Sequence, residues 1–261
     1  MLGILNSVHP SALIDPGATL SSGVVIGPHA IVGPGVILEA GVQLAPRAII
    51  ERNTHIGPGS SIGTGSIIGG RPQDLKYREE ESWVKIGANV VIREYVTVNR
   101  GTAASGVTQI GNQAYLMSYV HVAHDCNIGE AVIIANGTQL AGHIVVEDGA
   151  TISGLCALHQ FVRIGRQSFI GGCSRVNQDI PPFVKAAGNP LVLYGVNGLG
   201  LRRAGMDEAV ISALKHAYRL LFNSNLTRSE ALSRLEQLAT ESTEIDQLIT
   251  FLRNSNRGVP A

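Results

Sequence analysis

A period of six residues dominates this chain. Aliphatic side chains recur at every sixth position from Val8 to Ile68, and the same phase returns from Ile86 to Val98 and from Ile110 to Val176. Every one of these positions holds Ile, Leu or Val. A small residue mostly follows four positions later, and Gly or Asn, which tolerate left-handed backbone, often lies between the two. Each hexad therefore predicts a short strand with one inward side chain, followed by a tight corner.

This periodicity is typical of a parallel β-helix solenoid, in which neighbouring coils bury one continuous core. An α-helix would need apolar spacings of three and four, which this stretch does not keep. Three hexads make one triangular coil, so the repeat would fill roughly nine to ten coils of about 18 residues each. We therefore expect a mainly β protein. Periodicity alone leaves the hand of the solenoid open, since parallel crossovers are usually right-handed.

After residue 190 the hexads stop and helical patterns begin. The stretch 207–222 carries an amphipathic stripe, Thr227 and Glu230 form a capping box, and 243–252 supplies another amphipathic segment. We predict a solenoid over residues 1–190 and a helical domain over 191–261. Two polar segments, 70–85 and 104–109, interrupt the hexads without changing their phase and are predicted to be inserted loops.

Charge and composition exclude several classes of function. Lys plus Arg and Asp plus Glu number 20 each and the pI is about 7.1, so no global field favours nucleic acid or an anionic membrane. No apolar run is long enough for a transmembrane segment, and the chain is expected to be cytoplasmic. The three cysteines lack CxxC spacing, which argues against a disulfide framework or a cysteine zinc site. Cys126 and Cys156 occupy the small, inward-facing position of their hexads and are expected to be core residues.

Histidines gather on one edge of the predicted prism. The hexads that begin at Val122, Leu140 and Leu158 fall on the same side of successive coils, about 4.8 Å apart. We therefore expect His124, His143 and His159 to stack near that edge. His121 ends the preceding side and faces the same corner. A histidine at such a corner is usually an ordinary surface residue. Four on one edge, beside the 70–85 loop, make a candidate site.

The ordered motifs along the chain resemble those of the UDP-N-acetylglucosamine 3-O-acyltransferases, within the hexapeptide-repeat acyltransferase superfamily. The motifs are "QDLKY", "HVAHDC", "LAGH", "LHQF", "GGCSRVNQDIPP", "GNP" and "GVNGLGLRR". The resemblance covers essentially the whole chain. It implies a left-handed β-helix and a homotrimer with its sites between subunits. It also implies transfer of a 3-hydroxyacyl group from acyl carrier protein, an acidic donor, to the 3-hydroxyl of UDP-N-acetylglucosamine, the first step of lipid A biosynthesis, with no cofactor and no metal.

The resemblance also assigns roles to residues. Acyl transfer to a hydroxyl needs a base, a group that orients the base and a donor to the oxyanion, and these fall to His124, Asp125 and the backbone N–H of Gly142. Direct transfer is expected. Substrate binding falls to Gln73, Asp74, Lys76, His121, His143, His159, Gln160, Asn197 and Arg203. Gly172 looks like the residue that sets acyl length, and a glycine would leave the groove open for a longer chain.

Three positions depart from the family pattern. Asn99 replaces a frequent histidine, Leu199 replaces a common acidic residue, and Ala204 replaces a second arginine, so contacts to uridine and phosphate are in doubt. Two other functions fit parts of the sequence. Clustered histidines could ligate zinc in a hydratase like the γ-class carbonic anhydrases, and a non-catalytic β-helix scaffold would explain the hexads but not the histidine edge.

Overall fold

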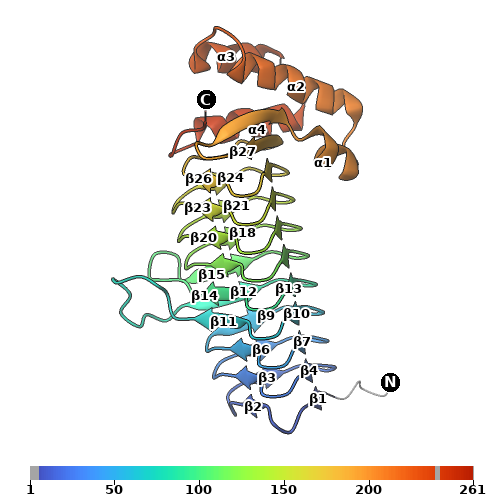
Figure 1. Cartoon of the computed structure of the whole chain (residues 1–261), viewed down its shortest axis with the longest axis vertical. Helices are drawn as coiled ribbons and strands as arrows, with labels where there is room; N and C mark the ends of the chain where they lie inside the picture. The colour runs from blue at the N-terminus through green and yellow to red at the C-terminus, as the bar shows by residue number, and fades with distance from the viewer. Residues whose placement is uncertain (1–5, 239–241, 261) are drawn as a thin grey trace.

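The structure is a computed structural model that describes residues 6–238 and 242–260. Over these residues, short strands stack into three sheets that form the faces of a long prism (Figure 1). Consecutive strands go to sheet A, then sheet B, then sheet C, and each pairs in parallel with the strand one coil away. The chain is a left-handed parallel β-helix with helices at its C-terminal end, as predicted.

The strands of each sheet follow, in the order in which they are hydrogen-bonded. Sheet A contains β1 (Ser7–Val8), β4 (Val25–Ile26), β7 (Gln43–Leu44), β10 (Ser61–Ile62), β13 (Val91–Ile92), β16 (Tyr115–Leu116), β19 (Ile133–Ile134), β22 (Thr151–Ile152), β25 (Phe169–Ile170), β27 (Val184–Ala187) and β28 (Val192–Val196). Sheet B contains β2 (Leu13–Ile14), β5 (Ile31–Val32), β8 (Ile49–Ile50), β11 (Ile67–Gly70), β14 (Thr97–Asn99), β17 (His121–Val122), β20 (Gln139–Leu140), β23 (Ala157–Leu158) and β26 (Arg175–Val176). Sheet C contains β3 (Thr19–Leu20), β6 (Ile37–Leu38), β9 (Thr54–Ile56), β12 (Trp83–Ile86), β15 (Val107–Ile110), β18 (Asn127–Ile128), β21 (Val145–Val146) and β24 (Arg163–Ile164).

The hexad pattern fills the core. The periodic aliphatic residue points inward in each coil and is fully buried from Ile26 onward, while the residue before it points outward. The small residue of the hexad is also buried, and Cys126 and Cys156 occupy this position as predicted. Burial raises the pKa of the Cys126 thiol to about 12, so this cysteine acts as a small core residue.

Both inserted segments leave the prism at the corner between sheets B and C. Both end earlier than predicted, because residues 83–86 and 107–110 are strands β12 and β15, paired side by side, and the second also begins earlier, directly after β14 ends at Asn99. Val84 in β12 and Thr108 in β15 point inward, whereas Lys85 and Gln109 after them point outward. Because polar residues are mixed into these strands, the alternation of period two is hard to recognise in the sequence. The loops proper are 71–82 and 100–106, and the longer one protrudes from the solenoid near β11 (Figure 1).

The C-terminal elements cover the last coil. Strand β28 pairs antiparallel with β27, so a strand lies where only helices were predicted. Helices α1 (Gly198–Arg203), α2 (Glu208–Phe222), α3 (Arg228–Leu238) and α4 (Thr243–Arg253) follow, and their apolar faces form a second core. Thr227 and Glu230 exchange hydrogen bonds as a capping box before α3, as predicted. Among the described residues, no helix has the length and apolarity needed to cross a membrane.

Candidate active site

Strand register decides which residues meet at the corner between sheets B and C. Residues eighteen apart occupy the same position in neighbouring coils, since His121 pairs with Gln139 and Gln139 with Ala157. One column therefore contains His124, Gly142 and Gln160, and the next contains Asp125, His143 and Phe161. His124, His143 and His159 all lie at this edge, as predicted, but they do not form one column, because their spacings of 19 and 16 residues place each one in a different column.

His124 and Asp125 form a buried pair in the turn between β17 and β18. His124 Nδ1 lies 2.8 Å from Asp125 Oδ2, and the Asp125 side chain is only 1% exposed. Burial opposes ionisation of Asp125, but hydrogen bonds from Ser105, His124 and Thr102 outweigh it and lower its pKa to about 2. Asp125 is therefore an anion that accepts from His124 Nδ1, which leaves His124 Nε2 as the nitrogen free to accept a proton.

Two donors to Asp125 come from the 100–106 loop and were missed in the sequence. Thr102 donates its N–H to Oδ1 at 2.9 Å and its hydroxyl to Oδ2 at 2.7 Å, while the Ser105 hydroxyl donates to Oδ1. The Thr108 hydroxyl accepts from the Asp125 backbone N–H. The sequence does show small polar residues where the hexads are interrupted. The six-residue period cannot predict which side chains these residues contact, because the loop does not follow it.

His143 is held between two rings. Its ring meets that of His124 edge-on with centroids 5.1 Å apart, and it stacks on the Phe161 ring with centroids 4.5 Å apart and the planes nearly parallel. His143 Nε2 lies 3.8 Å from Asp125 Oδ2, beyond hydrogen-bond distance. His143 thus packs behind His124 at the same corner.

A cavity of about 380 Å³ opens beside this pair on sheet B. Gln73 of the longer loop, His121, His124, Gly142 and Gln160 line it; the remaining lining residues are Ala123, Gln139, Leu140, Ala141, Ala157 and Leu158. His121 Nδ1 lies 2.7 Å from the Thr97 hydroxyl. Burial lowers the pKa of His121, and the nearby His124 lowers it further.

The backbone N–H of Gly142 has no hydrogen-bond partner among the described residues. The same position in earlier coils holds Pro16 and Pro34, which have no N–H to donate. This position of the corner therefore does not need its N–H to hold the coil together, and the Gly142 N–H is available to a bound oxygen beside His124.

Buried hydrogen bonds hold the longer loop against the solenoid. Tyr77 of this loop is buried, and the Arg100 guanidinium contacts both the Gly69 carbonyl and the Tyr77 hydroxyl. Asp74 accepts from the Lys76 N–H at 2.9 Å, which closes a local turn. The structure brings Gln73 into the cavity, whereas Asp74 and Lys76 do not line it.

Several predicted site residues lie elsewhere in this chain. His159 is exposed, with Nδ1 3.2 Å from the Gln160 carbonyl oxygen. Asn197 caps α1 and donates to the Gln167 carbonyl, and Arg203 ends the same helix. Gly172 lies at the corner between sheets A and B. None of these four lines the cavity beside His124.

The three departures now have positions. Asn99 is buried and donates to the Arg71 carbonyl at 3.0 Å, where the longer loop begins. Leu199 is exposed on α1, and Ala204 is the C-cap residue of that helix.

A metal centre fits this corner poorly. Ligand atoms of His124, Asp125 and His143 lie within 4.8 Å of one another, a grouping that could hold an ion. A carboxylate offers about four acceptor positions. Those of Asp125 already accept from the Thr102 N–H, the Thr102 and Ser105 hydroxyls and His124 Nδ1. Asp125 is therefore occupied by hydrogen bonds and has no acceptor position left for a metal ion, so the zinc hydratase alternative is not favoured.

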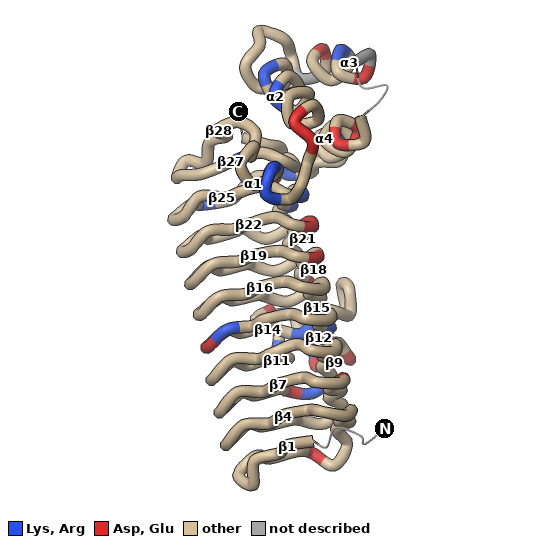
Figure 2. Tube along the Cα trace, turned by 90° about the vertical axis from the view of Figure 1, so that its right-hand side faces the viewer, with Lys and Arg blue, Asp and Glu red and all other residues tan. Residues whose placement is uncertain are grey.

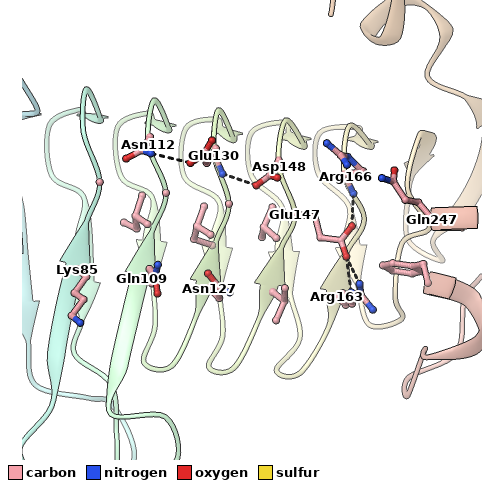
Figure 3. A pocket seen from close by; sticks show the side chains of 18 of the residues that line it. Lys85, Gln109, Asn112, Asn127, Glu130, Glu147, Asp148, Arg163, Arg166 and Gln247 are labelled. Carbon is pink, nitrogen blue, oxygen red and sulfur yellow. Dashed lines mark hydrogen bonds and ion pairs between the residues drawn. The ribbon is translucent and has the colours of Figure 1, made fainter. Parts of the chain in front are cut away.

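A larger cavity, of about 740 Å³, lies on the outer face of sheet C under α4 (Figure 3). Asn112 donates to Glu130 at 2.9 Å, the Glu130 N–H donates to Asp148, and Arg163 pairs with Glu147 and lies over the Phe251 ring. The described residues that line it include no histidine or cysteine. We place the candidate active site in the smaller cavity, because a base must be within reach of the group it deprotonates.

The hexad coils and the histidine–aspartate pair define this chain as a hexapeptide-repeat transferase. A family model described as bacterial transferase hexapeptide matches residues 7–40 and 108–142, and one described as UDP-N-acetylglucosamine O-acyltransferase, domain 2, matches residues 179–260. The chain belongs to the acyl-[acyl-carrier-protein]–UDP-N-acetylglucosamine O-acyltransferase family.

Three relatives support this assignment. An acyl-[acyl-carrier-protein]–UDP-N-acetylglucosamine O-acyltransferase of Burkholderia lata is 46% identical over 260 residues, covering 98% of this chain and 99% of that protein. One of Gloeothece citriformis is 50% identical over 206 residues, covering 79% of this chain and 74% of that protein. The crystal structure of the UDP-N-acetylglucosamine acyltransferase LpxA from Bacteroides fragilis superposes with a TM-score of 0.95 at 40% identity, covering 97% of this chain and all of the other.

Proposed function

We propose that this protein transfers a 3-hydroxyacyl group from acyl carrier protein to the 3-hydroxyl of UDP-N-acetylglucosamine, the first step of lipid A biosynthesis. The observation that carries the proposal is the buried His124–Asp125 pair in a cavity, within a chain that matches these acyltransferases along its whole length. A scaffold without activity does not require a buried carboxylate with four donors around it.

The proposed chemistry is direct transfer. His124 Nε2 takes the proton from the sugar 3-hydroxyl as its oxygen attacks the thioester carbonyl carbon. A new C–O bond forms and negative charge moves onto the carbonyl oxygen, where the free N–H of Gly142 donates to it. When the carbonyl re-forms, the C–S bond breaks and protonated His124 returns its proton to the departing sulfur, so the carrier leaves as a thiol and His124 is again neutral. Asp125 stays ionised throughout and holds the ring of His124 in place.

The substrates would meet the remaining assigned residues from two sides. Gln73 at the cavity, with Asp74 and Lys76 of the same loop, is proposed to contact the nucleotide sugar together with His121, His143, His159 and Gln160. Basic residues gather on α1 and α2 (Figure 2), and we propose that these helices receive the acidic donor protein. Asn197 and Arg203 are proposed to complete the site from a neighbouring subunit, since they do not reach the cavity of their own chain.

A homotrimer is part of this proposal. Tyr95, Tyr119 and Leu155 form an exposed apolar row along the corner between sheets A and B, with the two tyrosine rings stacked at 5.3 Å. Aligned apolar side chains on a surface are typical of an interface. The cytoplasmic location stays a prediction from the sequence.

The test is acyl transfer by the purified protein from a panel of 3-hydroxyacyl carrier proteins to UDP-N-acetylglucosamine. We expect the O-acylated nucleotide sugar as product, with the rate depending on acyl length. Lack of transfer with every donor would refute the proposal. Metal analysis of the same sample addresses the alternative, because one tightly held zinc per chain would favour the hydratase.

A further inference from the structure

The loop between β14 and β15, residues 100–106, contacts both halves of the candidate site. The coils that follow pass from sheet B to sheet C by a tight corner such as residues 123–126, so the solenoid does not need this longer connection. Its later residues reach the His124–Asp125 pair, and its first residue reaches the loop that carries Gln73.

At one end, Thr102 holds both oxygens of Asp125. Its N–H donates to Oδ1 at 2.9 Å and its hydroxyl to Oδ2 at 2.7 Å, so the plane of the carboxylate is fixed. The Ser105 hydroxyl also donates to Oδ1. Oδ2 is also the oxygen that accepts from His124 Nδ1. A shift of the loop would therefore turn the acceptor on which the orientation of His124 depends.

At the other end, Arg100 is only 3% exposed and lies under the longer loop. Its N–H donates to the Gly70 carbonyl at 2.9 Å, Nη1 donates to the Gly69 carbonyl, and Nη2 lies 3.4 Å from the Tyr77 hydroxyl. Glu51 Oε2 is 3.7 Å from Nη1 and partly balances the charge. Arg100 thus fixes both the start and the middle of the loop that presents Gln73.

We propose that residues 100–105 are a positioning segment that sets the sugar-binding loop and the catalytic pair at one fixed separation. Thr102 and Ser105 orient Asp125, and Arg100 holds the loop 71–82 over the cavity. None of the three lines the cavity, so each acts through another residue. The inference rests on the proposed function, because it assumes that Gln73, Asp74 and Lys76 contact the nucleotide sugar. Setting this separation before substrate arrives lowers the cost of reaching the reactive geometry.

The first test is Thr102→Val, which keeps the backbone N–H and the side-chain shape but removes the hydroxyl donor. We expect kcat to fall about tenfold, the effect of one hydrogen bond to a charged group, with KM for both substrates near the wild-type value. Thr102→Ser should restore most of the kcat. The matched control is Thr138→Val, which removes a buried hydroxyl that donates to Ser153 at a corner away from the pair. A wild-type kcat in Thr102→Val, or no recovery in Thr102→Ser, would overturn this half of the proposal.

The second test addresses the other end with Tyr77→Phe and Arg100→Lys. Both should raise KM for UDP-N-acetylglucosamine about five- to tenfold while KM for the acyl donor and kcat change little. Hydrogen exchange in residues 71–82 of the substrate-free protein should become faster. Unchanged exchange and unchanged KM in both variants would overturn the role of Arg100. If the wild-type protein transfers no acyl group, the proposed function fails, whereas the exchange experiment still decides whether Arg100 anchors the loop.

Discussion

The ring of His124 lies directly against Gly142 of the next coil, so closely that a β-carbon at residue 142 would stand 2.6 Å from His124 Cε1. The backbone of Gly142 is not in the left-handed region, so its own conformation would accept a side chain. We predict that Gly142→Ala folds but displaces His124 and lowers kcat at least a hundredfold. The control is the double variant with His124→Ala, which should be no slower than His124→Ala alone. Additive losses would show that the alanine acts by another route.

Removal of the proposed base should affect turnover and leave folding intact. We predict that His124→Ala loses roughly 10²- to 10⁴-fold in kcat, the usual contribution of a general base, with a melting temperature near wild type. His29→Ala, at a corner several coils away, is the matched control and should retain activity. Steady-state acyl transfer measures both. Near wild-type activity in His124→Ala would move the role to His121.

The depressed pKa of Asp125 makes part of the stability depend on pH. Its pKa is about 2 in the folded protein and about 3.9 in an unfolded chain, so its ionised form stabilises the fold above about pH 4. This contribution, on the order of 2 kcal/mol, should be lost as the pH falls from about 5 to 2.

We therefore predict that the stability difference between wild type and Asp125→Asn narrows over that pH range. Urea unfolding at a series of pH values and at one protomer concentration measures it. A difference that does not vary with pH would show that hydrogen bonding of Asp125 does not favour its charged form.

Acyl length offers a prediction that separates two neighbouring glycines. A β-carbon at Gly171 would lie 2.8 Å from Ala187 Cβ, whereas one at Gly172 would meet only the Gly154 carbonyl oxygen at 3.3 Å and Ser153 Cβ at 3.9 Å. A β-carbon is therefore less crowded at Gly172, where it needs the Gly154 carbonyl to move by only a few tenths of an ångström, than at Gly171. We predict that Gly172→Met folds and assembles normally but shifts preference from long to short 3-hydroxyacyl donors.

The size of this shift follows from burial, because each methylene that loses its place forfeits about 0.8 kcal/mol. Competition between long and short donors measures the preference directly. If all donors slow down together, or if Gly172→Met misfolds, the glycine serves the backbone and acyl length is set elsewhere.

The apolar row along the corner between sheets A and B predicts how the chain assembles. Leu155 is 68% exposed and Tyr119 is 61% exposed, which is costly unless another subunit covers them. We predict that Leu155→Glu shifts the proposed trimer toward monomer in sedimentation at micromolar concentration. Gln109→Glu, on the outer face of sheet C, should leave the trimer intact. A stable monomer in the wild-type protein would refute the assembly itself.

The amino-acid sequence by itself determined the repeating part of this protein. A side chain that recurs every six residues must face the same direction in every coil, so the aliphatic positions fill one core and Cys126 and Cys156 become buried. The helical end and its capping box at Thr227 follow from patterns that are equally local. Such features need no knowledge of distant contacts, because each repeat specifies its own place.

Only the tertiary structure decided how the site is built. The register of the strands places Gly142 next to His124 and puts His159 in a different column. The sequence assigned each hexad to a side of the prism, but that assignment does not distinguish positions that differ by one or two residues. The contacts of Thr102 and Arg100 lie in irregular loops, where backbone direction follows no period. Their partners, Asp125 and Tyr77, are 23 residues away along the chain. Local pattern cannot predict such hydrogen bonds, because they depend on how two insertions pack against the same corner.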